Sequence, residues 1–189
     1  MSIHPMELLK QKVSSVIVND QTSLMNEKND VLSRFYPILL YRFLEKPELV
    51  DKLREKLTPS VFDLLEENDR VKNAMLLRLA AGKVSIAEAE VILNRAIPKS
   101  LAVLSNEAGN DAIRIIYYLR DHKASIYSLL PNWTEEVLAQ LYETEHNVPV
   151  LTPMPAISAE PEPKKQTKIF PFLTVLFGFS LIFLYHLSK

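Results

Sequence analysis

Residues Ser85–Gly109 read SIAEAEVILNRAIPKSLAVLSNEAG, and their pattern recurs through most of the chain. Apolar residues return every three or four positions, which is the period of an amphipathic helix. Ser85 and Glu88 have the spacing of a capping box at a helix start, and Gly109 is typical of a helix end. Pro98 falls between two apolar stretches, and a proline inside a helix removes a hydrogen bond and clashes one turn back. The stretch therefore predicts two consecutive short helices, the second opened by Pro98.

The same pattern continues on both sides and covers residues 1–147. Short helices of this kind hold together only by packing, so we predict an all-α fold, a compact bundle or short array of about nine or ten helices of roughly ten residues each. Apolar residues expected on their inner faces include Leu57, Ile113 and Tyr117. Further helix boundaries are expected at Pro5, Pro37 (a kink or break), Thr58-Pro59, Asn68, Gly82, Asn110-Asp111 and Asn132.

A different composition begins after this region. Residues 148–168 read VPVLTPMPAISAEPEPKKQTK, and their five prolines leave no helical or alternating period. Such a stretch favours an extended, partly polyproline II spacer. We therefore predict a linker between the helical domain of residues 1–147 and whatever follows it.

Residues Ile169–Leu187 read IFPFLTVLFGFSLIFLYHL and carry no charged side chain. Their length fits a helix that crosses the roughly 30 Å apolar core of a bilayer. Tyr185 lies where an interfacial aromatic residue is expected, and two residues follow Leu187. The segment at 169–187 therefore predicts a single-pass, tail-anchored membrane protein.

Three lysines precede this segment, at Lys164, Lys165 and Lys168. Positive charge on one side of a membrane span marks the cytoplasmic side, so the helical domain is expected in the cytoplasm. The same lysines also favour anionic headgroups, by about 1 kcal/mol per charge near the surface.

Composition argues against several classes of function. The net charge of −1 offers no basic footprint for nucleic acid, and the absence of cysteine excludes disulfides and thiolate metal sites. With three glycines the chain has no phosphate-cradling loop. His122 is the one histidine well inside the helical region, at a predicted helix end where a cation suits the helix dipole. We therefore predict no catalytic residue, no metal site and no cofactor.

A few exposed side chains are candidates for binding a protein partner. Aromatic residues are enriched at interface hot spots, although each of these rings also fits ordinary core packing. Arginines that share a helix face with Tyr117 suit an acidic partner, or form a plain solvated surface. The candidates are Phe35 and Tyr36 at the predicted kink, Tyr118 as the outward ring of a tyrosine pair, Trp133 in the first turn of the last helix, and Arg114 with Arg120.

Three stretches carry a family resemblance: LSRFYPILL (Leu32–Leu40), ILNRAIPKSLAVLSNEAG (Ile92–Gly109) and HKASIYSLLPNW (His122–Trp133). They resemble the helical N-terminal region of some bacterial envelope proteins, which precedes a single membrane segment and then an OmpA-like domain that binds peptidoglycan. The region is similar to the YidB-like family of helical domains. The resemblance implies a cytoplasmic helical module anchored in the bacterial inner membrane, and it brings no catalytic residue.

These features together predict a non-enzymatic, tail-anchored adaptor or scaffold that binds a protein partner, or a second copy of itself, while its anchor lies in the lipid bilayer. An alternative is a membrane-tethered enzyme or small-ligand-binding domain, which would need several polar groups around one cavity. A third is a protein that oligomerises through its span, where Gly178 and Ser180 are a pair of small residues.

Overall fold

The computed structural model of the chain describes residues 3–18 and 24–146, with side chains up to residue 142. These described residues form helices and no strand, which confirms the all-α prediction for this part of the chain. None of their helices is both long enough and apolar enough to cross a bilayer. The predicted linker (148–168) and anchor (169–187), with Lys164, Lys165, Lys168 and Tyr185, lie outside the described residues.

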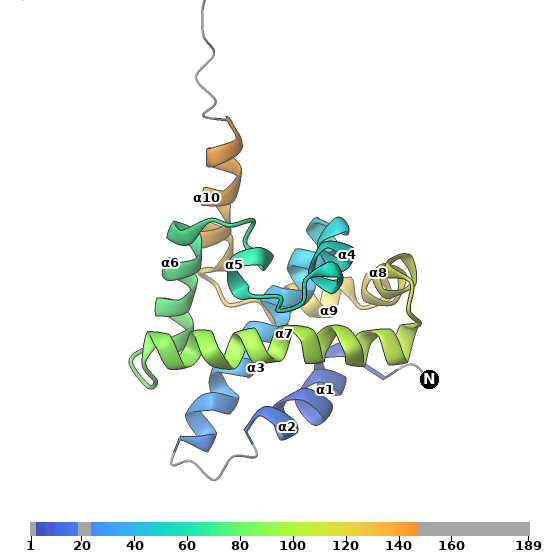
Figure 1. Cartoon of the computed structure of the whole chain (residues 1–189), viewed down its shortest axis with the longest axis horizontal. Coiled ribbons are helices and arrows are strands. Elements are labelled where there is room, and N and C mark those ends of the chain that lie inside the picture. The colour runs from blue at the N-terminus through green and yellow to red at the C-terminus, as the bar shows by residue number, and fades with distance from the viewer. Residues whose placement is uncertain (1–2, 19–23, 147–189) are drawn as a thin grey trace, which may run out of the picture. The chain divides into compact units, whose positions relative to one another are not determined.

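Two long helices organise the described part of the chain, and shorter ones pack around them. In Figure 1, α7 crosses the near side of the molecule and α3 passes behind it. The elements are α1 (Pro5–Leu9), the π-helical turn η1 (Lys10–Ser14), α2 (Ser15–Ile17), α3 (Met25–Glu45), α4 (Glu48–Glu55), α5 (Val61–Leu64), α6 (Asp69–Ala80), α7 (Ile86–Ala108), α8 (Ala112–Asp121), α9 (Lys123–Ser128) and α10 (Thr134–His146).

The predicted helix start at Pro98 is wrong, and of the kink or break predicted at Pro37 the break is wrong. Helix α3 continues through Pro37 for 21 residues, and α7 continues through Pro98 for 23 residues. Each proline removes one backbone hydrogen bond, but a continuous helix keeps the apolar stripes on both sides of it in register. In α7 that stripe buries Ala89, Ile92, Leu93, Ala96, Ile97, Leu101 and Leu104.

Several predicted helix starts are confirmed. Pro5 opens α1, and the side chains of Asn68 and Asp111 accept hydrogen bonds from the backbone N–H groups of Val71 and Ile113, at 3.1 and 3.0 Å. These bonds satisfy N–H groups that lack a partner inside the first helical turn. Ser85 likewise accepts from the N–H of Glu88 at 3.1 Å.

Other boundaries differ by one or two residues. Helix α5 is capped by Ser60, not by Thr58-Pro59, and Ser60 and Asp63 form both halves of a capping box. The left-handed residue that ends α6 is Ala81, with φ of 46°, one position before the expected Gly82. Helix α10 begins at Thr134, after the expected Asn132.

A buried charge holds the turn between α5 and α6 against α3. Arg42 of α3 is fully buried, and its guanidinium donates a hydrogen bond to Glu66, which also accepts one from Lys46. Burial opposes ionisation of Glu66, but the hydrogen bonds from Lys46 and Arg42 outweigh it and hold the pKa of this carboxyl below its usual value. Glu66 therefore stays ionised and compensates a cation that has no access to water.

The backbone of this turn is strained at the same residue. Glu66 and its neighbour Glu67 have φ angles of 56° and 63°, in the left-handed region that costs a residue with a Cβ about 1 kcal/mol or more. The ion pair with Arg42 and Lys46 offsets that strain, because a charge buried without its partner is strongly unfavourable.

We predict that Glu66→Gln lowers the free energy of unfolding by about 1–3 kcal/mol, because it leaves the buried Arg42 charge uncompensated. Glu67→Gln is the matched control: Glu67 shares the left-handed backbone but is mostly exposed, and its carboxylate lies 3.6 Å from Lys56. The control should change stability by less than about 0.5 kcal/mol. Urea denaturation followed by circular dichroism measures both, and equal losses would show that the Arg42 contact is unimportant.

Candidate functional site

Two of the predicted partner-binding aromatics lie in the core. Phe35 and Tyr36 are both 0 % exposed, so they present no surface to a partner, and this prediction is corrected. The reason is that α3 continues through Pro37 and both rings lie on its buried face. The hydroxyl of Tyr36 lies 2.8 Å from Oγ of Ser14, and burial raises the pKa of Tyr36 to about 12.

The tyrosine pair of α8 faces the opposite way from the prediction. Tyr118 is buried at 9 % exposure and its hydroxyl donates a hydrogen bond to the carbonyl of Ile3, whereas Tyr117 is 61 % exposed. The buried stripe of α8 is Ile115, Ile116, Tyr118 and Leu119, which is shifted around the helix from the predicted stripe. The binding candidate is therefore Tyr117, and Tyr118 belongs to the core.

Trp133 precedes α10 and is half-buried, with its side chain packed against the main hydrophobic cluster. The sequence predicted Trp133 in the first turn of the helix, but it lies just before the helix starts. Its ring therefore contributes mainly to packing the start of α10 onto the rest of the helical region.

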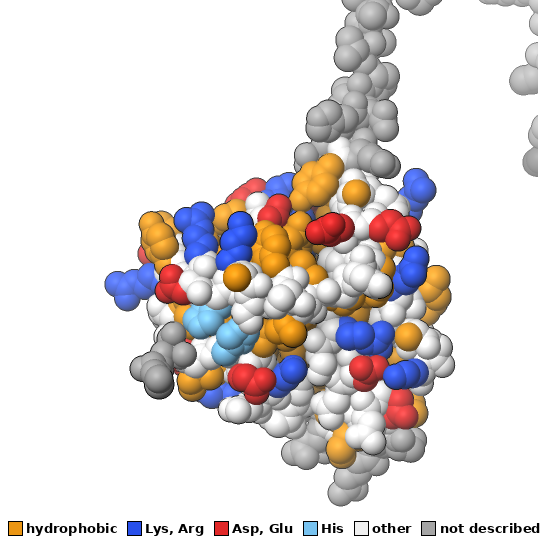
Figure 2. Space-filling model, turned by 180° about the vertical axis from the view of Figure 1, so that it is seen from behind, with side chains coloured by type: hydrophobic (Ala, Val, Ile, Leu, Met, Phe, Trp, Pro, Cys, Tyr) orange, Lys and Arg blue, Asp and Glu red, His pale blue; other side chains and the backbone are white. Residues whose placement is uncertain are grey.

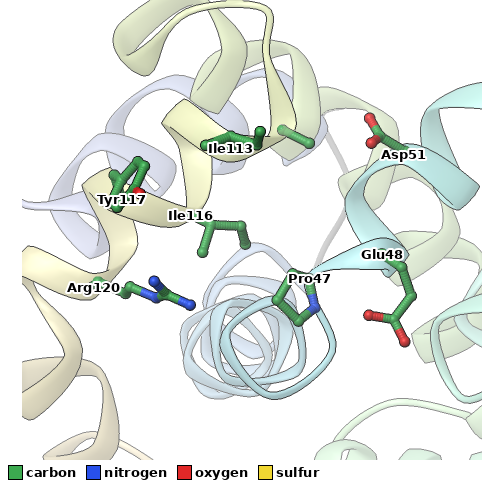
Figure 3. Close-up of a pocket in the computed structure, with 8 residues that line it drawn as sticks. Pro47, Glu48, Asp51, Ile113, Ile116, Tyr117 and Arg120 are labelled. Carbon is green, nitrogen blue, oxygen red and sulfur yellow. The ribbon is translucent and has the colours of Figure 1, made fainter.

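A groove between α4 and α8 combines exposed apolar side chains with charges of both signs (Figure 3). On α8, Ile113 and Tyr117 are 62 % and 61 % exposed and lie one helical turn apart. The guanidinium of Arg120 lies 5.8 Å from the ring centre of Tyr117, in cation–π geometry. We name this hollow the α4–α8 groove; it has a volume of about 260 Å³ and is lined by Pro47, Glu48, Asp51, Ala112, Ile113, Ile116, Tyr117 and Arg120.

The charges of the α4–α8 groove are separated across it. Glu48 and Asp51 stand on α4, and Arg120 stands on α8 on the other side of the hollow (Figure 3). Among the described residues no ion pair joins the two sides. Both signs therefore remain available to an occupant that places a cation near α4 and an anion near Arg120.

Only one of the two predicted arginines belongs to this groove. The side chain of Arg114 folds over the α7–α8 turn, where a Cβ built on Gly109 would lie 3.0 Å from its Cδ. Arg114 therefore covers the glycine that ends α7, while Arg120 lines the groove. No pattern in the sequence connects Glu48 and Asp51 with α8, because the fold alone brings α4 beside it.

A cluster of His4, His122 and Ser125 bears on the alternative prediction that the protein is an enzyme. Nε2 of His4 lies 2.8 Å from Oγ of Ser125, and the rings of His4 and His122 meet edge to face at 5.1 Å between centres. Figure 2 shows histidine side chains gathered on the face turned away in Figure 1. A serine beside a histidine is the arrangement of an activated nucleophile when the histidine accepts the hydroxyl proton.

Hydrogen bonding assigns His4 the opposite role. Its Nδ1 accepts the backbone N–H of Met6 at 3.3 Å and so caps α1. A neutral imidazole with an acceptor at Nδ1 carries its proton on Nε2, which then donates to Ser125. The pair of His4 and Ser125 therefore provides a helix cap and no general base. Among the described residues, no group of histidines and carboxylates is arranged to hold a metal ion.

The same geometry makes the cap of α1 sensitive to pH. Burial lowers the pKa of His4 below its usual value of 6.5, and the neighbouring His122 lowers it further. Glu7 opposes this effect and Lys10 adds to it. The folded state thus holds His4 neutral, and its stabilising contribution is present above pH 6.5 and lost as the pH falls through the lowered pKa.

We predict that His4→Asn weakens this pH dependence, because an asparagine cap keeps the acceptor for Met6 and does not titrate. The free energy of unfolding of the unaltered chain should fall between pH 7.5 and pH 5, and that of the variant should fall less. Urea titrations at the two pH values measure the difference. Parallel losses in both proteins would assign the acid sensitivity to other groups.

Comparison of the chain with protein-family models, with curated proteins and with solved structures gave no match. The resemblance to YidB-like helical domains thus stays a prediction.

Proposed function

We propose that the chain is a non-enzymatic, tail-anchored membrane protein whose helical domain binds a protein partner on the cytoplasmic side of the bacterial inner membrane. The observation that carries this proposal is the α4–α8 groove, where Ile113 and Tyr117 expose apolar surface between charges of opposite sign. Interfaces typically place such an aromatic residue at the centre of a polar rim.

The dimensions of the α4–α8 groove favour a protein segment over a small ligand. Its volume of about 260 Å³ lies below the roughly 300–1,000 Å³ of common ligand pockets. An amphipathic helix laid along α8 would cover Ile113 and Tyr117, with a basic residue toward Glu48 and Asp51 and an acidic residue toward Arg120. This pattern of charges also fixes the direction of the bound helix.

The anchor is supported by the apolar stretch at 169–187 and the lysines that precede it. Anchoring would raise the effective concentration of the helical domain at the membrane without any new contact. The proline-rich linker would give that domain reach from the surface.

We predict that deletion of residues 169–189 moves the protein from the membrane fraction to the supernatant, because the apolar segment is the proposed span. Cell fractionation followed by carbonate and detergent extraction measures this. A deletion variant that stays in the membrane fraction and resists carbonate would contradict the anchor.

We predict that Ile113→Asp and Tyr117→Ala reduce recovery of the partner by about tenfold or more, since loss of a central interface residue costs about 2 kcal/mol. Tagged full-length protein is isolated from its own cells in mild detergent, and bound proteins are quantified by mass spectrometry. The matched control is Leu77→Asp on α6, which alters an apolar residue of similar exposure (61 %) away from the groove. Equal recovery with groove variants and control would remove the α4–α8 groove from the proposal.

A further inference from the structure

A second groove lies between α7 and the segment that joins α4 to α5. Figure 1 shows this segment beside α7. It consists of two hollows of about 370 and 770 Å³ that share the side chains of Leu57, Pro59, Pro98 and Ala102. Because the hollows share these four residues, they form one continuous surface, which we name the α7 groove. It has no lining residue in common with the α4–α8 groove.

The middle of the α7 groove is apolar and open to solvent. Leu57 is 98 % exposed, against the prediction that it packs inward, because α4 ends at Glu55 and the chain turns away from the core. Val91 of α7 is 58 % exposed and lines the same surface. Apolar side chains gathered at one place on a surface are typical of a binding site.

The wall of this groove is fixed before anything binds. The side chain of Asn94 accepts a hydrogen bond at 2.8 Å from the N–H of Val61, which ties the start of α5 to α7. Lys56 donates to Asp63, and the Ser60 capping box closes the turn between them. A groove built in this way requires little ordering when a ligand enters.

Cations flank the apolar middle on both sides. Arg54 and Lys56 line one hollow, Lys99 lines the other, and no carboxylate is among the described residues that line either one. Lys56 is offset by Asp63, but Arg54 donates to the carbonyl of Asn110, a neutral group that leaves its positive charge uncompensated. The α7 groove therefore complements a ligand with negative charge at both ends and apolar groups between.

We propose that the α7 groove binds an acidic peptide segment in which apolar side chains are flanked on both sides by aspartate or glutamate. The two hollows beside the exposed apolar side chains suit the side chains of a peptide better than the flat face of a bilayer. This inference goes beyond the proposed function, because it concerns a different surface and the chemistry of a second partner.

The test uses the full-length protein in mild detergent and a short fluorescein-labelled peptide whose central leucines are flanked by glutamates. Fluorescence anisotropy should show binding with a micromolar Kd that weakens as salt is added. Leu57→Asp and Lys99→Glu should each weaken binding about tenfold, and Tyr117→Ala in the α4–α8 groove should leave it unchanged. Circular dichroism checks that the variants remain folded, as expected for the fully exposed Leu57.

Four outcomes overturn the proposal. A peptide with lysines in place of glutamates could bind equally well, or the Leu57 and Lys99 variants could bind like the unaltered protein. Displacement of the peptide by short-chain phosphatidylglycerol, but not by phosphatidylcholine, would assign the groove to anionic lipid. Dimers of the protein that the peptide dissociates, seen by size-exclusion chromatography with and without peptide, would assign the groove to a second copy of the chain. Failure here leaves the α4–α8 groove untouched, since neither Leu57 nor Lys99 lines that groove.

Discussion

The buried face of α7 is the constraint on which the rest of the helical region depends. Helices α1 to α6, the π-helical turn and α8 all contact α7, so segments from Pro5 to Asp121 pack against one helix. Most of these segments are too short to be stable alone in water. They persist because the stripe from Ala89 to Leu104 offers each of them apolar area to bury. The exposed outer face of the same helix carries the α7 groove, so one element supplies both the core and a surface for binding.

Local features of the fold were readable from the sequence, and features that depend on packing were not. Asn68 and Asp111 cap helices through hydrogen bonds to residues two or three positions away, so their types and spacing suffice to predict them. Pro37 and Pro98 were misjudged because the cost of a proline is local, while the burial that outweighs it comes from neighbouring helices. Helix α8 is apolar on several sides, so its sequence fits either Tyr117 or Tyr118 facing inward.

The candidate sites also combine local features, which the sequence predicts, with features that depend on packing, which it does not. Arg120 was identified because it shares a helix face with Tyr117. Glu48 and Asp51 lie on α4, far away in the chain, and no local pattern connects them with α8. The exposure of Leu57 follows from the end of α4 at Glu55, and helix ends are the least certain part of any sequence-based assignment. A groove depends on which helices become neighbours, and that is decided by the whole packed core.

The turn at Glu66 also restricts how the sequence can change over evolutionary time. Its left-handed backbone favours glycine, while the buried guanidinium of Arg42 requires a carboxylate at the same position. No amino acid meets both demands, so Glu66 provides the carboxylate and its backbone is strained. A drift to glycine would be tolerated only in a chain that had already replaced Arg42 by an apolar residue. We therefore expect these two positions, 24 residues apart in the chain, to change together.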